Sequence, residues 1–157
     1  MERHIKQLLT EKILHEAFRY WLPSVDTFQL LDEVENFVYE CQQGEHSWII
    51  RISHSSHRHE EEILAELDWI HYLKQQQFSV CLPLISNHQQ WVHRILLEDS
   101  AFYITAFEKA SGQMLSKENI NEWTFSRIHS LGKLIGQLHH ASQEYQPHPN
   151  YRRLLWY

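Results

Sequence analysis

The chain has 157 residues, which fits one domain of ordinary size or one and a half small lobes. With 43% hydrophobic and 13% aromatic residues it can build a sizeable core, and this composition excludes a disordered or low-complexity chain. The net charge of −6 argues against a general binder of nucleic acid or of anionic membranes, because both classes present a basic face.

The sequence carries no signal for a compartment other than the cytoplasm. It has no run of about 18 apolar residues, so no membrane span is expected. Its first residues, Met-Glu-Arg-His-Ile-Lys, lack the apolar core of a signal peptide, which favours a cytoplasmic location. Cys41 and Cys81 stand in apolar surroundings without metal-type spacing and are expected to be reduced core thiols.

The N-terminal part predicts one helix followed by strands. The helix is expected over residues 4–21, where apolar residues recur on one face, and Pro23 follows it. Residues 43–45 read as a hairpin turn. Three strand-like runs lie around that turn, at residues 28–31, 36–42 and 47–53.

A single cation stands in the third apolar run. Arg51 needs a partner there, because an unpaired buried guanidinium is very costly. An amphipathic helix is predicted over residues 58–74, and its acidic residues are the nearest candidates. They are Glu66 in the middle of the helix and the run Glu60–Glu62 in its first turn, which is expected to be solvated and to complement the helix dipole.

The remaining elements are strands, a linker and helices. Residues 80–86 contain Pro83 and predict an edge strand. Antiparallel strands are expected over 91–97 and 101–107, and the small polar residues 108–112 predict a linker or hinge. Helices are expected over 116–123 and 126–141, the second with one apolar face made of Ile128, Leu131, Leu134, Ile135 and Leu138.

This order of elements predicts an α+β fold in which an antiparallel sheet pairs as hairpins around one helix. It divides the chain into a lobe over residues 1–107 and a helical fragment over residues 108–157.

The order and the residues resemble the N-terminal lobe of the protein-kinase-like fold. The chain is most similar to the aminoglycoside, choline and homoserine phosphotransferase family, from about residue 28 to its end. Five segments carry the resemblance: Glu35-Asn-Phe-Val-Tyr-Glu-Cys, Trp48-Ile-Ile-Arg-Ile, Ala65-Glu-Leu-Asp-Trp-Ile-His-Tyr-Leu, Tyr103-Ile-Thr-Ala-Phe-Glu-Lys-Ala-Ser-Gly and Leu131-Gly-Lys-Leu-Ile-Gly-Gln-Leu-His-His. It implies a sheet of about five strands with one packed helix, preceded by the N-terminal helix and followed by a hinge and the first helices of a truncated C-terminal lobe.

The resemblance also implies a nucleotide site for ATP. Arg51 would take the place of the cation that contacts the nucleotide phosphates, since a guanidinium binds phosphate through a fork of N–H donors. Glu66 would be the helix carboxylate that orients this cation, which makes it the preferred partner over Glu62.

Two further parts of the site follow from the same resemblance. The backbone of Glu108 and Ala110 would bond the adenine edge, with Phe107 at the back of the pocket. Asn36 would lie at the hairpin that covers the phosphates. That hairpin contains no glycine, so it would approach phosphate less closely than a glycine-rich loop.

Phosphoryl transfer in this family also requires Mg²⁺, metal-binding carboxylates and a catalytic Asp. The family carries them well downstream of the helix that corresponds to residues 126–141. No Asp occurs after Asp99, so the chain looks truncated and no catalytic residue or metal ligand is assigned to it. It is expected to lack kinase activity by itself.

Two other functions stay open. A non-catalytic module could self-associate or bind a partner through surface that the missing lobe would cover. A weaker alternative is a metal binder, because the chain has 13 histidines and His54, His57 and His59 cluster in one loop. None of these forms an HExxH motif or joins a Cys pair.

Overall fold

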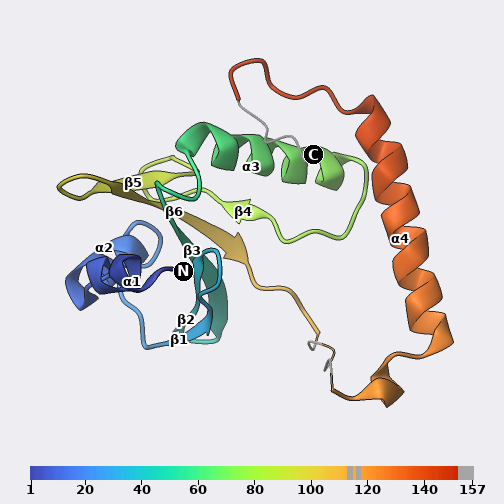
Figure 1. Cartoon of the computed structure of the whole chain (residues 1–157), viewed down its shortest axis with the longest axis horizontal. Helices are drawn as coiled ribbons and strands as arrows, with labels where there is room; N and C mark the ends of the chain where they lie inside the picture. Colours follow the sequence, from blue (N-terminus) through green and yellow to red (C-terminus); the bar gives the residue numbers. More distant parts are fainter. Residues whose placement is uncertain (113–114, 116–117, 152–157) are drawn as a thin grey trace.

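The structure is a computed structural model that describes residues 1–112, 115 and 118–151. Figure 1 shows a twisted sheet with helices on both sides of it and a long helix standing apart. The elements are α1 (Arg3–Leu8), α2 (Glu11–Arg19), β1 (Thr27–Asp32), β2 (Phe37–Gln43), β3 (His46–His54), α3 (Glu60–Gln75), β4 (Pro83–Leu84), β5 (His93–Leu96), β6 (Ala101–Glu108), a 3-10 turn (Ile120–Glu122) and α4 (Phe125–Glu144).

The single N-terminal helix predicted over residues 4–21 is wrong in one respect, because two helices stand there. Leu9 leaves the helical conformation, and Thr10 begins α2 by accepting a hydrogen bond from the amide of Ile13 (3.4 Å). Threonine is favoured at this capping position because its hydroxyl satisfies an amide that has no partner inside the helix. The second helix ends at Arg19, before Pro23 is reached.

The sheet is antiparallel throughout and has the strand order β1-β2-β3-β6-β4, with β5 also paired to β6. The turn between β2 and β3 depends on Gly44, whose φ of +59° is a conformation that other residues rarely adopt. In this register Arg51 of β3 lies between Val38 of β2 and Thr105 of β6. The edge position predicted for the strand with Pro83 is confirmed.

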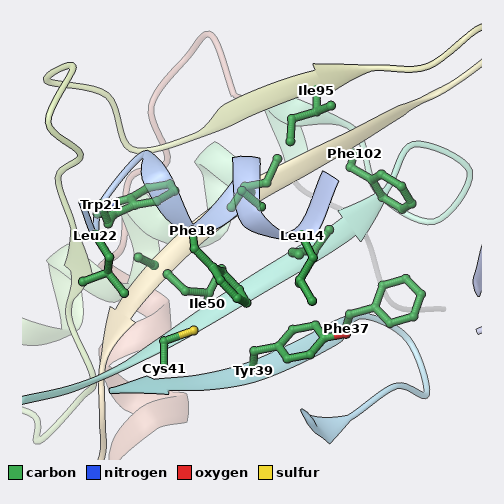
Figure 2. Packing of buried hydrophobic residues seen from close by; sticks show 14 of the residues in the cluster. Leu14, Phe18, Trp21, Leu22, Phe37, Tyr39, Cys41, Ile50, Ile95 and Phe102 are labelled. Atoms are coloured by element: carbon green, nitrogen blue, oxygen red, sulfur yellow. The ribbon is translucent and has the colours of Figure 1, made fainter. Parts of the chain in front are cut away.

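Both faces of the sheet are covered by helices. Phe18 of α2 packs on Tyr39 and Phe28 on one face, with ring centroids 5.7 and 5.3 Å away (Figure 2). On the other face Ile63 and Leu67 of α3 pack in a second cluster. The helix and sheet architecture expected from the sequence is confirmed, with six strands in place of about five.

Helix α4 confirms the predicted helix over 126–141, but its apolar face is not buried. Ile128, Leu131, Leu134 and Ile135 are all exposed in the part of the chain that the structure describes. The C-terminal end of α4 docks on α3: the Tyr72 hydroxyl donates to the Ala141 carbonyl (3.1 Å) and the Tyr145 hydroxyl to Asp68 (2.5 Å).

Three predictions concern the C-terminal part. The short helix predicted over 116–123 is a 3-10 turn at Ile120–Glu122, while residues 116 and 117 lie outside the described residues. The division between residues 107 and 108 stays a prediction, and β6 ends at Glu108 beside it. No helix in the described ranges is long and apolar enough to cross a membrane.

Substitution of a buried phenylalanine and of an exposed one should change the free energy of unfolding by very different amounts. Phe18→Ala removes a ring that is 1% exposed and should lower the free energy of unfolding by about 3–5 kcal/mol, because it leaves a cavity in a packed cluster. Phe125→Ala on α4, where the ring is 84% exposed, is the matched control and should change it by less than about 1 kcal/mol. Urea denaturation followed by tryptophan fluorescence measures both, and equal losses would contradict the packing described.

Candidate nucleotide-binding cleft

A cleft of about 750 Å³ lies where the sheet meets the segment that follows β6. This volume is in the range that holds small-molecule ligands. Its walls are mainly apolar, with Leu31, Val38 and Ile49 from the first three strands. Arg51 and residues 108–112 supply the polar part of the lining. Cys81 also lines the cleft, so it is not the core thiol that the sequence predicted.

Arg51 reaches the wall of this cleft with part of its guanidinium unused. Its Nη1 donates to Oε1 of Glu66 (2.6 Å), and its Cζ lies 4.9 Å from the centre of the Phe107 ring. Its Nε and Nη2 are buried and have no hydrogen-bond partner among the described residues. A buried donor without a partner costs free energy, so these two groups point to a ligand.

Glu66 is therefore the partner of Arg51, as preferred from the sequence. Burial opposes its ionisation, but the charges of Arg51 and of a second arginine, Arg58, outweigh burial and lower the pKa of Glu66. Arg58 donates from Nη2 to the other carboxylate oxygen.

The acidic run Glu60–Glu62, which precedes Glu66, has a different role. Glu62 is buried, and its carboxylate accepts a hydrogen bond from the amide of His59 (3.0 Å) at the start of α3. The solvated helix start predicted for Glu60–Glu62 is therefore wrong for Glu62.

The segment after β6 brings the predicted adenine contacts to the cleft. Phe107, Glu108 and Ala110 all line it. The amide of Glu108 donates to the Leu82 carbonyl (2.9 Å), so that amide is engaged within the protein. Lys109 forms an ion pair with Glu40 of β2 (2.5 Å), which ties this segment to the sheet.

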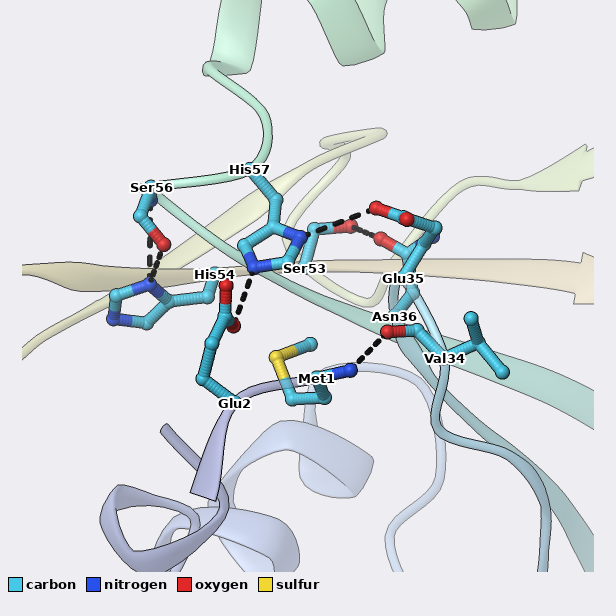
Figure 3. Close-up of polar contacts among 9 residues, drawn as sticks. All are labelled: Met1, Glu2, Val34, Glu35, Asn36, Ser53, His54, Ser56 and His57. Atoms are coloured by element: carbon cyan, nitrogen blue, oxygen red, sulfur yellow. Dashed lines mark hydrogen bonds and ion pairs between the residues drawn. The ribbon is translucent and has the colours of Figure 1, made fainter. Parts of the chain in front are cut away.

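The hairpin between β1 and β2 is anchored at four successive residues, of which Val34, Glu35 and Asn36 are drawn in Figure 3. Asn36 accepts a hydrogen bond from the Ser53 hydroxyl (2.6 Å), and Glu35 contacts His57 (3.2 Å). The Val34 carbonyl accepts from the Met1 amino group, and Glu33 pairs with Lys6. Asn36 thus lies in the predicted hairpin, but its side-chain oxygen is engaged by β3 and it does not line the cleft.

His57 links this hairpin to the N-terminus. Its Nε2 lies 2.8 Å from Glu2 and its Nδ1 3.2 Å from Glu35, as Figure 3 shows. Carboxylates only accept hydrogen bonds, so the arrangement favours an imidazolium with both nitrogens protonated. The hydrogen bond to Glu2 first, and then the one to Glu35, raise the pKa of His57.

Sequence reasoning missed Arg58, Lys109 and His57 as contributors to this region. Arg58 had a signal, because it stands eight residues before Glu66 beside a helix that carries the sought carboxylate. His57 and Glu2 are 55 residues apart, and Lys109 and Glu40 are 69 apart, so only the tertiary arrangement reveals those pairs.

The described residues contain no group of three or more His, Cys, Asp or Glu side chains placed to hold a metal ion. The histidine-rich metal binder stays a prediction without a site.

The sheet, the packed helix and the Arg51–Glu66 pair together define the N-terminal lobe of a kinase-like phosphotransferase. The sequence pattern of the phosphotransferase enzyme family matches residues 27–157, and the chain belongs to this family.

Relatives of known function or structure agree with this assignment. Amicoumacin kinase of Bacillus subtilis (strain 168) is 28% identical over 159 residues, covering 99% of this chain and 46% of that protein. The solved structure of amicoumacin kinase hAmiN in complex with AMP-PNP, Ca²⁺ and Ami has a TM-score of 0.85 and 29% identity, and it covers 99% of this chain and 47% of its own. A microcompartment-associated aminopropanol kinase shares the fold at a TM-score of 0.78 and 23% identity, over 94% of this chain and 45% of its own. The chain thus spans about half the length of these relatives.

The His57 contacts predict a pH-dependent stability. Because the folded state raises the pKa of His57 above its ordinary value of 6.5, the contribution is complete below that value and is lost as the pH rises through the raised pKa. His57→Gln should therefore lower the melting temperature more at pH 5.5 than at pH 8.5. His139→Gln, at an exposed position of α4, is the control and should show no such pH-dependent difference. An equal loss at both pH values would contradict the charged state of His57.

Proposed function

We propose that this chain is the nucleotide-binding half of an ATP-dependent phosphotransferase. One observation carries the proposal: a cleft of about 750 Å³ is bordered by Arg51, which is held by Glu66 and has two buried N–H groups without a partner among the described residues. The triphosphate would bind at these groups, because charge-assisted hydrogen bonds to phosphate are the strong ones.

The adenine would occupy the apolar part of the cleft. Val38 and Ile49 would contact one face of the ring, and Phe107 would close the back of the pocket. The Glu108 carbonyl and the Ala110 amide would bond the adenine edge, since the Glu108 amide already donates to Leu82. The bound AMP-PNP of the similar amicoumacin kinase structure supports a nucleotide in this family.

The whole protein would use Mg²⁺ and transfer the γ-phosphoryl group to a hydroxyl of a small molecule. Two relatives named for the small molecules amicoumacin and aminopropanol support this acceptor class over a protein. This chain alone should bind nucleotide without transferring phosphate, because no Asp after Asp99 is present to serve as catalytic base or metal ligand.

Binding of AMP-PNP tests the proposal directly. Arg51→Gln should weaken AMP-PNP binding about tenfold or more in isothermal titration calorimetry, since it removes charge-assisted contacts to phosphate. Adenosine, which has no phosphate, should bind both proteins alike.

Two controls accompany that titration. Arg94→Gln changes an exposed arginine of β5 and should leave both affinities unchanged. In Arg51→Gln the Glu66 carboxylate keeps its ion pair with Arg58, and circular dichroism should show that the variant stays folded. Wild-type affinity for AMP-PNP in a folded Arg51 variant would remove the phosphate role.

A second function, self-association, is favoured by the exposed apolar face of α4. Exposed apolar patches of this kind commonly mark interfaces. In this reading two copies of the chain would pair through Leu131 and Ile135 and would cover the stripe that lacks a partner among the described residues.

Sedimentation velocity tests the self-association. The chain should show a concentration-dependent shift toward a dimer, and Leu131→Glu/Ile135→Glu should abolish it by placing charge in the interface. His129→Glu lies on a different side of α4 and is the control. A wild-type chain that stays monomeric at about 100 μM, a concentration that a specific interface of even modest affinity saturates, would exclude this function.

A further inference from the structure

Two arginines share the carboxylate of Glu66, one on each oxygen. Arg51 of β3 donates from Nη1 to Oε1 (2.6 Å). Arg58, in the loop between β3 and α3, donates from Nη2 to Oε2. The three side chains are 17%, 31% and 29% exposed for Arg51, Arg58 and Glu66, so the cluster is largely shielded from water.

This sharing decides which nitrogens of Arg51 are left free. A carboxylate with both oxygens available commonly grips one guanidinium through two parallel N–H bonds. With Oε2 taken by Arg58, Glu66 holds Arg51 through a single nitrogen. The Nε and Nη2 of Arg51 stay without a partner among the described residues.

The two free groups have the geometry that a phosphate needs. Nε–H and Nη2–H are the two donors along one edge of the guanidinium, and they point in parallel. Such an edge binds two oxygens of a phosphate at once, whereas a lone ammonium would bind as a point charge. The edge of Arg51 that remains free is thus the one suited to an anion with two acceptor oxygens.

The charge of the cluster leads to the same conclusion. One arginine and Glu66 would sum to zero, whereas two arginines and Glu66 sum to +1. The lowered pKa of Glu66 keeps its carboxylate ionised at neutral pH, so this net charge is preserved. Because the site is shielded, a single positive charge attracts a nearby anion more strongly there than it would in water.

We propose that Arg58 is a positioning residue that occupies the second oxygen of Glu66 and thereby keeps the Nε–Nη2 edge of Arg51 free of a protein acceptor, so that it can bind a nucleotide phosphate. The proposal rests on the proposed function, since it assigns a phosphate to Arg51. Without Arg58, Glu66 would rotate to grip Arg51 through two nitrogens and would neutralise it.

The test compares Arg58→Gln with Arg58→Lys by calorimetry, with AMP-PNP and adenosine as probes in the same buffer. Arg58→Gln should weaken AMP-PNP about tenfold, the effect of one charge-assisted hydrogen bond, and should leave adenosine within twofold. Arg58→Lys keeps the charge and a donor for Oε2 and should recover most of the affinity. Arg94→Gln is the control at an exposed arginine.

A second measurement needs no nucleotide. In Arg58→Gln the Nη2–H groups of Arg51, followed by ¹⁵N NMR, should exchange more slowly with water, because the freed oxygen of Glu66 can accept a hydrogen bond from Nη2, next to the Nη1 that Glu66 already holds. Unchanged exchange and unchanged AMP-PNP affinity would overturn the role of Arg58, as would an equal loss for both ligands, which marks a purely structural contact. If Nη2–H exchange slows but neither wild type nor Arg51→Gln binds AMP-PNP, the geometry holds, while the phosphate assignment and the proposed function fail together.

Discussion

A permanently charged arginine in the middle of a sheet is the constraint on which this lobe depends. Arg51 lies between β2 and β6, where it cannot lose its charge and where its side chain is largely shielded from water. Glu66 meets it from α3, one position before Leu67 on the face that packs on the sheet. The same rotation of α3 therefore buries its apolar residues and delivers the carboxylate. A turn of the helix by one residue would lose both, so the ion pair and the core fix the helix together.

The helices on the two faces of the sheet have different roles. α1 and α2 bury the face that carries Tyr39 and Ile50, which leaves the opposite face to α3 and the cleft. Lys6 of α1 also holds the hairpin between β1 and β2 directly through Glu33, and Glu2 does so indirectly through His57, which contacts Glu35. That hairpin has no glycine, and its anchored side chains are consistent with a preformed wall that needs little movement on binding. The absence of glycine and the anchored side chains thus both favour a hairpin that moves little.

Much of this fold followed from local patterns, because helix and strand periodicity survive in a single sequence. The Arg51–Glu66 pair could also be predicted from the sequence, since a buried cation next to an acidic helix has few possible partners. The break at Thr10 had a local signal, a capping residue, that the long apolar face of residues 4–21 concealed. Contacts such as that of His57 with Glu2 had no local signal in the sequence, because they join surfaces that only folding brings together. The exposure of α4 could not be predicted for another reason: its periodicity shows which face is apolar but not what covers it.

The exposed apolar face of α4 bears on whether nucleotide binding and phosphoryl transfer depend on the same parts of the structure. The walls proposed for the nucleotide, from Leu31 to Ala110, are supplied by one continuous sheet and the segment that leaves it, so they require nothing from α4. α4 touches the lobe through Tyr72 and Tyr145 at one end, while four residues of its apolar face, Ile128, Leu131, Leu134 and Ile135, are 43–53% exposed. Nucleotide affinity should be a property of the sheet and α3, whereas phosphoryl transfer should require the layer that packs on α4.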